Sequence, residues 1–230
     1  MNEVLKDSVF FGIFLTLACY QIGVWVKKKT KIALATPLLV ASVLIIAILL
    51  VFHIDYESYD NGAKYVTYFL TPATVSLAVP LYRQLKLLKE HPVAIFGGIA
   101  SGVLTAMVSI FLMSLAFGLT HEQYITLLPK SVTTAIGVGV SDKMGGIPAL
   151  TTIAISVTGI TGAVFAETVC KLFGIRNPVA KGLAIGTSAH ALGTSRAMEM
   201  GEVEGAMSSL CIVTAGFMTV LSVSIFANFL

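Results

Sequence analysis

The sequence predicts an all-α polytopic membrane protein, because it is strongly apolar, poor in charge and divided into runs long enough to span a bilayer. Of its 230 residues, 56% are hydrophobic and 12% are charged, and the mean hydropathy is +0.89. A soluble domain has about 25% charged residues, so this chain has too few to cover a water-facing surface. The formal net charge of +3 gives no indication of a nucleic-acid partner.

The apolar runs define the expected helices, since a span needs about 20 apolar residues. They lie at 8–26, 32–53, 63–82, 92–119, 147–170 and 205–230. Two further segments, 121–142 and 179–199, are shorter and interrupted. The first run follows a segment without a basic region, and no small-residue cleavage site follows it. We therefore expect it to remain as a span.

The basic residues predict the orientation, because cytoplasmic loops carry an excess of Lys and Arg. Ten of the fifteen lie in three clusters after predicted spans: Lys27, Lys28, Lys29 and Lys31; Arg83, Lys86 and Lys89; and Lys171, Arg176 and Lys181. If all three are cytoplasmic, the N-terminus is outside, the C-terminus is inside, and 121–142 enters and leaves on one face as a re-entrant segment. The alternative, a full span at 121–142, would place the third cluster outside.

Three landmarks indicate an internal repeat. Pro37 and Pro148 open spans 111 residues apart, the segments ending at Arg83 and Arg196 are 113 apart, and small-residue starts at Gly97 and Gly205 are 108 apart. Because the two proline-led spans run in opposite directions, the halves 1–119 and 120–230 would form an inverted repeat within one integral membrane domain, as in many transporters. Chance matching of apolar segments is the alternative.

Residues that break helices mark three polar segments within the apolar chain: Pro72 and Pro80, Pro129, and Gly186 and Gly193. Proline removes a helix hydrogen bond, and freed backbone groups survive at membrane depth only inside protein or beside water. We therefore expect the first and last of these segments to be broken helices that cross near the midplane. Their half-helix N-termini would favour a small anion.

The candidate substrate-binding residues are hydroxyl, imidazole and cationic side chains in these segments: Thr74, Lys130, Ser131, Thr133, Thr134, Thr187, Ser188, His190, Thr194 and Arg196. For the hydroxyls, the alternative is close helix packing. Lys130 is either an entrance cation or a snorkelling interfacial lysine.

His190 and Arg196 each leave two interpretations open. His190 contacts substrate or carries a proton, or it is a packed, hydrogen-bonded residue. Arg196 binds a carboxylate or pairs with Glu199 one helical turn away.

Catalytic and metal-binding chemistry has little support in the sequence. There is no H-E-x-x-H or C-x-x-C motif, and Ser188 and His190, two residues apart, are not a nucleophile–base pair in themselves. Cys19, Cys170 and Cys211 have no metal-like spacing. We expect no enzymatic activity, no cofactor and no metal.

The segments LPKSVTTAIGVGVS, KGLAIGTSAHALGTSRAMEM and EGAMSSL resemble the signature blocks of the LrgB/CidB family. TPATVSLAVPLY, SDKMGGIPALT and IRNPVAKGLAIG also fit, so the resemblance covers the whole chain. That family is labelled antiholin-like, and its relatives include the plastid glycolate/glycerate translocator and bacterial pyruvate uptake systems. The resemblance implies a bacterial cytoplasmic membrane and a separate partner chain, a small LrgA/CidA-type holin-like protein.

Residue chemistry and resemblance together predict a secondary transporter of small 2-hydroxy or 2-oxo monocarboxylates, such as glycolate, glycerate, lactate or pyruvate. It would work by alternating access, and proton coupling through His190 is a further hypothesis. The alternative is an antiholin-like regulator of a holin-like partner, murein hydrolase activity and autolysis. The small-residue face at 97–102 permits close packing in a homodimer.

Overall fold

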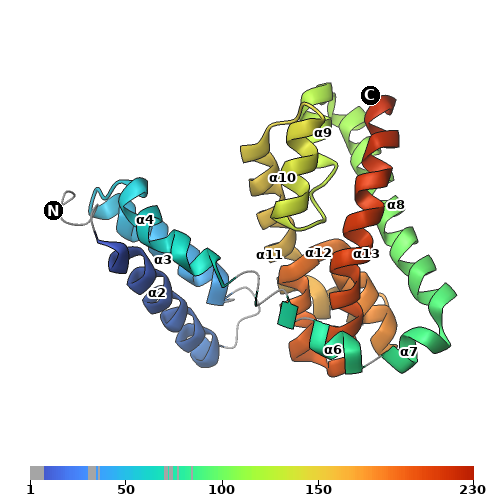
Figure 1. Cartoon of the computed structure of the whole chain (residues 1–230), viewed down its shortest axis with the longest axis horizontal. Helices are drawn as coiled ribbons and strands as arrows, with labels where there is room; N and C mark the ends of the chain where they lie inside the picture. The colour runs from blue at the N-terminus through green and yellow to red at the C-terminus, as the bar shows by residue number, and fades with distance from the viewer. Residues whose placement is uncertain are drawn as a thin grey trace. The chain divides into compact units, whose positions relative to one another are not determined.

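The computed structural model describes residues 8–30, 35, 37–69, 72, 75–76, 78–83 and 85–230. Within these ranges every regular element is helical (Figure 1), which confirms the predicted all-α class. In the described part of the chain, four helices are long and apolar enough to cross a membrane: Val9–Thr30, Pro92–Phe117, Pro148–Leu172 and Glu202–Phe229. The chain is therefore a membrane protein.

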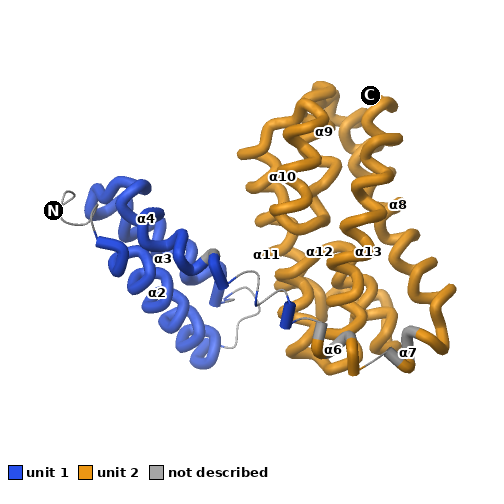
Figure 2. Tube along the Cα trace, viewed as in Figure 1, with its two compact units in different colours: residues 1–76 blue, residues 77–230 orange. Residues whose placement is uncertain are grey.

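The chain forms two compact units, Met1–Ser76 and Leu77–Leu230 (Figure 2). Unit 1 contains α2 (Val9–Thr30), α3 (Pro37–Val51) and α4 (Tyr56–Thr67). Gly12 and Gly62 let the backbones of α2 and α4 touch, because a Cβ atom at Gly62 would lie 2.7 Å from the Gly12 nitrogen. Small residues are the usual means of close helix packing in membranes. The expected span at 63–82 falls partly in α4 and partly in unit 2, and Thr74 lies outside the described residues.

Unit 2 contains the remaining elements: α6 (Ala78–Arg83), α7 (Leu85–Glu90), α8 (Pro92–Phe117), α9 (His121–Leu127), α10 (Thr134–Lys143), α11 (Pro148–Leu172), α12 (Pro178–Met200), α13 (Glu202–Phe226) and the 3₁₀ turn η1 (Ala227–Phe229). Proline opens α8, α11 and α12, where its missing N–H costs no helix hydrogen bond. Two glycines with positive φ, Gly118 and Gly174, follow α8 and α11.

The three long helices of unit 2 alternate in direction (Figure 1). The end of α8 lies beside the end of α13, where the Phe111 and Phe229 ring centroids are 5.8 Å apart. The end of α11 instead lines a pocket with Glu204, at the start of α13. Helix α11 therefore runs antiparallel to α8 and α13.

Helices α9 and α10 form a first hairpin, residues 121–143, with its tip at 128–133. The tip packs against the first turn of α10, because a Cβ atom at Gly137 would be 3.1 Å from the Pro129 carbonyl oxygen. In the first turn of α11, Thr151 donates to the carbonyl of Thr126, near the end of α9, at 3.0 Å and to Ser141 Oγ, near the end of α10, at 2.6 Å. The segment thus enters and leaves at one end of the unit, as the re-entrant prediction requires.

Helix α12 is a second hairpin, residues 178–200, because its backbone reverses at His190 (φ 43°, ψ −135°). Residues eight apart in a continuous helix are separated by about 12 Å. A Cβ atom at Gly193, however, would lie 3.0 Å from the Ile185 carbonyl oxygen. The arms 178–189 and 191–200 are therefore packed against each other.

Contacts with α13 confirm the reversal. Ser208 of α13 packs closely against Gly186 in one arm. Its hydroxyl also forms a 2.8 Å hydrogen bond with the hydroxyl of Thr194 in the other arm. The segment doubles back at the depth where we expected a broken helix to continue. Its predicted crossing with residues 72–80 stays a prediction. Pro72 is described and exposed and Pro80 lies within α6, but Thr74, between them, falls outside the described residues.

Candidate functional site

A polar cavity of about 630 Å³ lies where the two hairpin tips meet the middle of α8 and α11. Its lining residues are Ser101, Gly102, Thr105, Ala106, Ser109, Lys130, Ser131, Val157, Thr158, Thr161, Gly162, Thr187 and Ser188. Four of the sequence-predicted candidates meet here: Lys130 and Ser131 from the first hairpin, and Thr187 and Ser188 from the second.

Lys130 gives this cavity its charge, because it is the one ionisable side chain among the described lining residues. Two backbone turns place Lys130 at the tip. Its own N–H donates to Leu127 O at 3.0 Å, and the Val132 N–H donates to Pro129 O at 3.3 Å. Its ammonium lies 3.4 Å from Ser131 Oγ. No carboxylate lines the cavity in the described part of the chain, so the ammonium is available to an anion.

The cavity hydroxyls fall into two groups. Ser101, Thr105 and Ser188 donate to carbonyls of their own helices at 2.7–2.8 Å, as hydroxyls in apolar helices commonly do. The hydroxyl groups of Thr158 and Thr161, on α11, make no hydrogen bond among the described residues. Both threonines can therefore donate to a ligand without losing an existing bond.

His190 forms the turn of the second hairpin, but it is not one of the residues that line the cavity. It is 5% exposed, and its Nε2 lies 3.1 Å from the Ile155 carbonyl oxygen. Since a carbonyl only accepts, Nε2 carries the proton in this bond. Its positive φ is unusual for a residue other than glycine, and Thr194 Oγ1 donates to its carbonyl at 2.9 Å. Both side chains stabilise the reversal.

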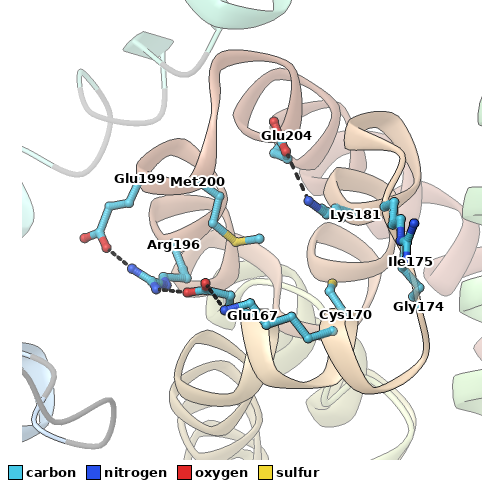
Figure 3. A pocket seen from close by; sticks show the side chains of 11 residues that line it. Glu167, Cys170, Gly174, Ile175, Lys181, Arg196, Glu199, Met200 and Glu204 are labelled. Carbon is cyan, nitrogen blue, oxygen red and sulfur yellow. Dashed lines mark hydrogen bonds and ion pairs between the residues drawn. The ribbon is translucent and has the colours of Figure 1, made fainter.

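Arg196 lies in a second pocket of about 610 Å³ at the open end of the second hairpin (Figure 3). Its guanidinium joins Glu167 of α11 at 2.8 Å and Glu199 at 2.5 Å. Lys171 also pairs with Glu167, at 2.8 Å. The alternative left open by the sequence, a structural ion pair with Glu199, is present, and Arg196 is not brought together with Lys130.

The other sequence candidates occupy supporting positions. Thr133 is the N-cap of α10 and Thr134 is its first residue, and neither lines the cavity. Pro129 begins the tip of the first hairpin. Gly186 and Gly193 lie within the arms of the second hairpin, on either side of the reversal at His190.

Sequence reasoning missed the hydroxyls that the long helices supply. Ser101, Thr105 and Ser109 recur every four residues and so share one face of α8. Thr158 and Thr161 lie on α11. The helical spacing in α8 was a usable indication, although hydroxyls in membrane helices more often serve packing.

Together, the fold and the cavity define a polytopic membrane protein in which two helical hairpins enter from opposite ends and meet around a polar, singly cationic site. The chain belongs to the LrgB-like family, whose model matches residues 16–229. Two curated relatives, from Bacillus cereus (strain B4264) and Bacillus anthracis (strain CDC 684 / NRRL 3495), are each called "Antiholin-like protein LrgB". Each is 38% identical over 222 residues, covering 96% of both chains. No solved structure matches the chain.

Proposed function

We propose that the protein is a secondary transporter of small 2-hydroxy or 2-oxo monocarboxylates, such as glycolate, glycerate, lactate and pyruvate, and that it works by alternating access. The cavity between the hairpin tips carries this proposal. Transporters typically bind substrate near the midplane, between interrupted helices. The proposal involves no covalent change to the substrate.

The lining chemistry supports a monocarboxylate over other solutes. One lysine can neutralise one carboxylate, and a charge-assisted hydrogen bond is about twice as strong as a neutral one. A second carboxylate would find no second cation among the described lining residues. The surrounding hydroxyls suit the polar 2-substituent, and about 630 Å³ leaves room for water beside a two- or three-carbon anion.

Orientation follows from the basic residues. Lys171, Arg176 and Lys181 line the pocket at the open end of the second hairpin. By the positive-inside rule we place this end at the cytoplasmic face of a bacterial cell membrane. Because the second hairpin returns the chain to this end, α13 begins here and the C-terminus would lie outside, opposite to the inside C-terminus expected from the sequence. The outside N-terminus stays a prediction. A coupled proton on His190, a homodimer and an LrgA/CidA-type partner belong to the same hypothesis.

Uptake by purified protein in liposomes tests the proposal. Radiolabelled glycolate or pyruvate should accumulate, and Lys130→Gln should reduce the rate at least tenfold, because it removes the charge with little change in size. Lys143→Gln is the matched control, since Lys143 is exposed at the end of α10 and should leave uptake near the wild-type rate. Absence of uptake by the wild type, with and without the holin-like partner, would overturn the transporter proposal.

A second candidate function rests on the name of the relatives, "Antiholin-like protein LrgB". By that name we would expect the chain to restrain a holin-like membrane partner and, through it, autolysis. Lys130→Gln separates the two functions. A regulator would keep its effect on lysis in this variant, whereas a transporter whose effect on lysis depends on substrate would lose both activities together.

A further inference from the structure

The cavity is built from two copies of one motif, 56 residues apart. Residues 92–145 align with 148–201 without a gap, at about half the spacing of the repeat expected from the sequence landmarks. The matched identities include Pro92 with Pro148, Thr105 with Thr161, Phe117–Gly118 with Phe173–Gly174, Gly137 with Gly193, and Met144–Gly145 with Met200–Gly201. Each copy is one long helix followed by one hairpin.

The structure reproduces the same contacts in both copies at the ends of the long helices. The glycines that follow them have φ of 61° at Gly118 and 65° at Gly174. The next N–H groups donate five residues back, Leu119 to Ser114 at 3.0 Å and Ile175 to Cys170 at 2.8 Å.

The hairpins match as well. A Cβ atom would lie 3.1 Å from the Pro129 carbonyl oxygen at Gly137, and 3.0 Å from the Ile185 carbonyl oxygen at Gly193. Ile185 is 56 residues after Pro129. These shared contacts between matched positions show that the alignment is structural and is not a chance match of apolar letters.

The two copies have opposite orientations, because α8 and α11 are antiparallel and the hairpins enter from opposite ends. The cavity lining obeys the same relation. Thr105 and Thr161 are matched lining residues, as are Ser131 and Thr187 at the two tips. A lining made of matched positions lies on the pseudo-two-fold axis that relates the copies.

One matched position breaks the symmetry. Lys130 of the first hairpin corresponds to Gly186 of the second, and Gly186 packs against Ser208, where a Cβ atom would lie 2.8 Å from the Ser208 carbonyl oxygen. The charge is therefore supplied by one hairpin alone, while hydroxyls come from both copies.

We propose that one small carboxylate binds on this axis, held by the ammonium of Lys130 and by hydroxyls in matched pairs, Thr105 with Thr161 and Ser131 with Thr187. To donate to the carboxylate, the hydroxyls of Thr105 and Thr187 turn away from the Ser101 and Leu183 carbonyls that they bond in this structure. This inference rests on the proposed transport function and deepens it. Because both hairpins touch the same ligand, opening the first exposes the site to one side of the membrane. Opening the second exposes it to the other.

The matched threonines provide the first test, with radiolabelled glycolate and pyruvate as probes and liposome uptake as the readout. Thr105→Val and Thr161→Val should each lower the uptake rate about tenfold, as expected for loss of a hydrogen bond to a charged group. Thr152→Val is the matched control, because Thr152 is exposed on α11, its hydroxyl donates to Pro148 O, and it lies outside the cavity. An effect confined to one member of the pair would overturn the axial site.

Thiol protection gives a second test that does not depend on transport rate. Ser131→Cys and Thr187→Cys, at two positions that line the cavity, would be labelled with a small maleimide in a background in which Cys19, Cys170 and Cys211 are replaced by Ala, because the native cysteines and these two positions are similarly buried. Saturating glycolate or pyruvate should slow labelling of both positions. Protection of one or neither, in protein whose wild type transports the probe, would overturn this inference and leave the transport function standing. Absence of wild-type uptake together with absence of protection would overturn both.

Discussion

The two hairpins of unit 2 share a backbone plan but are held by different chemistry. The first is fixed at its open end by buried hydroxyls, with Thr151 donating to Thr126 and Ser141. The second is fixed by partly exposed ion pairs, with Arg196 bridging Glu167 and Glu199. Buried hydrogen bonds are costly to leave unmade, whereas exposed ion pairs contribute little and are screened by salt. We infer that the open end of the second hairpin is the more sensitive of the two to ionic strength.

The largest effect is expected where the second hairpin meets α13. Gly186→Ala should lower stability by about 1–3 kcal/mol, the usual cost of overpacking, because its Cβ atom would lie 2.8 Å from backbone atoms of Ser208. Gly139→Ala in the first hairpin is the control, since nothing lies within 4 Å of a Cβ atom there. Thermal unfolding in detergent, followed by size-exclusion chromatography, measures both variants. Equal melting temperatures would show that the close α12–α13 packing is not required.

The hydroxyl contact of the first hairpin should come next. Thr151→Val keeps the shape of the side chain but leaves the Thr126 carbonyl and Ser141 Oγ without their donor, which should cost about 1–3 kcal/mol. The melting temperature should fall by a similar amount at low and high salt, because no ionised group is involved. A strong salt dependence of this loss would contradict the account of the first hairpin.

The ion pairs of the second hairpin should give the smallest effect. Arg196→Gln removes both bonds to Glu167 and Glu199, but the Arg196 side chain is 29% exposed and Glu199 is 53% exposed. We expect a loss of at most about 1 kcal/mol at low salt, vanishing as added salt screens the wild-type pairs. Hydrogen exchange of the arm 191–200 in the two salt conditions would measure it. Unchanged exchange in both would show that these ion pairs do not hold the hairpin.

Comparison of the hairpins also shows how far the sequence can be interpreted. Composition and run length were enough to predict the helical membrane class and the interrupted segments 121–142 and 179–199. Pro129 was predicted as a helix break, and it lies between α9 and α10. The reversal at His190 was not predictable, because a one-dimensional hydropathy pattern is the same for a kinked helix and for one that doubles back. The backbone angles of His190 and the contacts of Gly186 and Thr194 with Ser208 distinguish them.

The candidate site was predicted in part for the same reason. The hairpin residues Lys130, Ser131, Thr187 and Ser188 lie in conspicuously polar segments, so sequence reasoning found them. Thr105 and Thr161 lie singly in long apolar helices, where a hydroxyl usually only packs or bonds its own backbone. The 56-residue repeat that pairs them was obscured by low identity. Its clearest indications in the sequence were the matched Phe–Gly pairs at 117–118 and 173–174.

The central claim is that the anion site lies at the cavity around Lys130 and not at the Arg196 pocket. The most direct measurement is uptake of radiolabelled glycolate and pyruvate into liposomes by Lys130→Gln and Arg196→Gln, at matched protein abundance. The account predicts at least a tenfold loss in Lys130→Gln and a rate within about twofold of wild type in Arg196→Gln, since a screened ion pair is worth at most about 1 kcal/mol. Loss of uptake in Arg196→Gln with normal uptake in Lys130→Gln would contradict it and move the binding site to the other pocket.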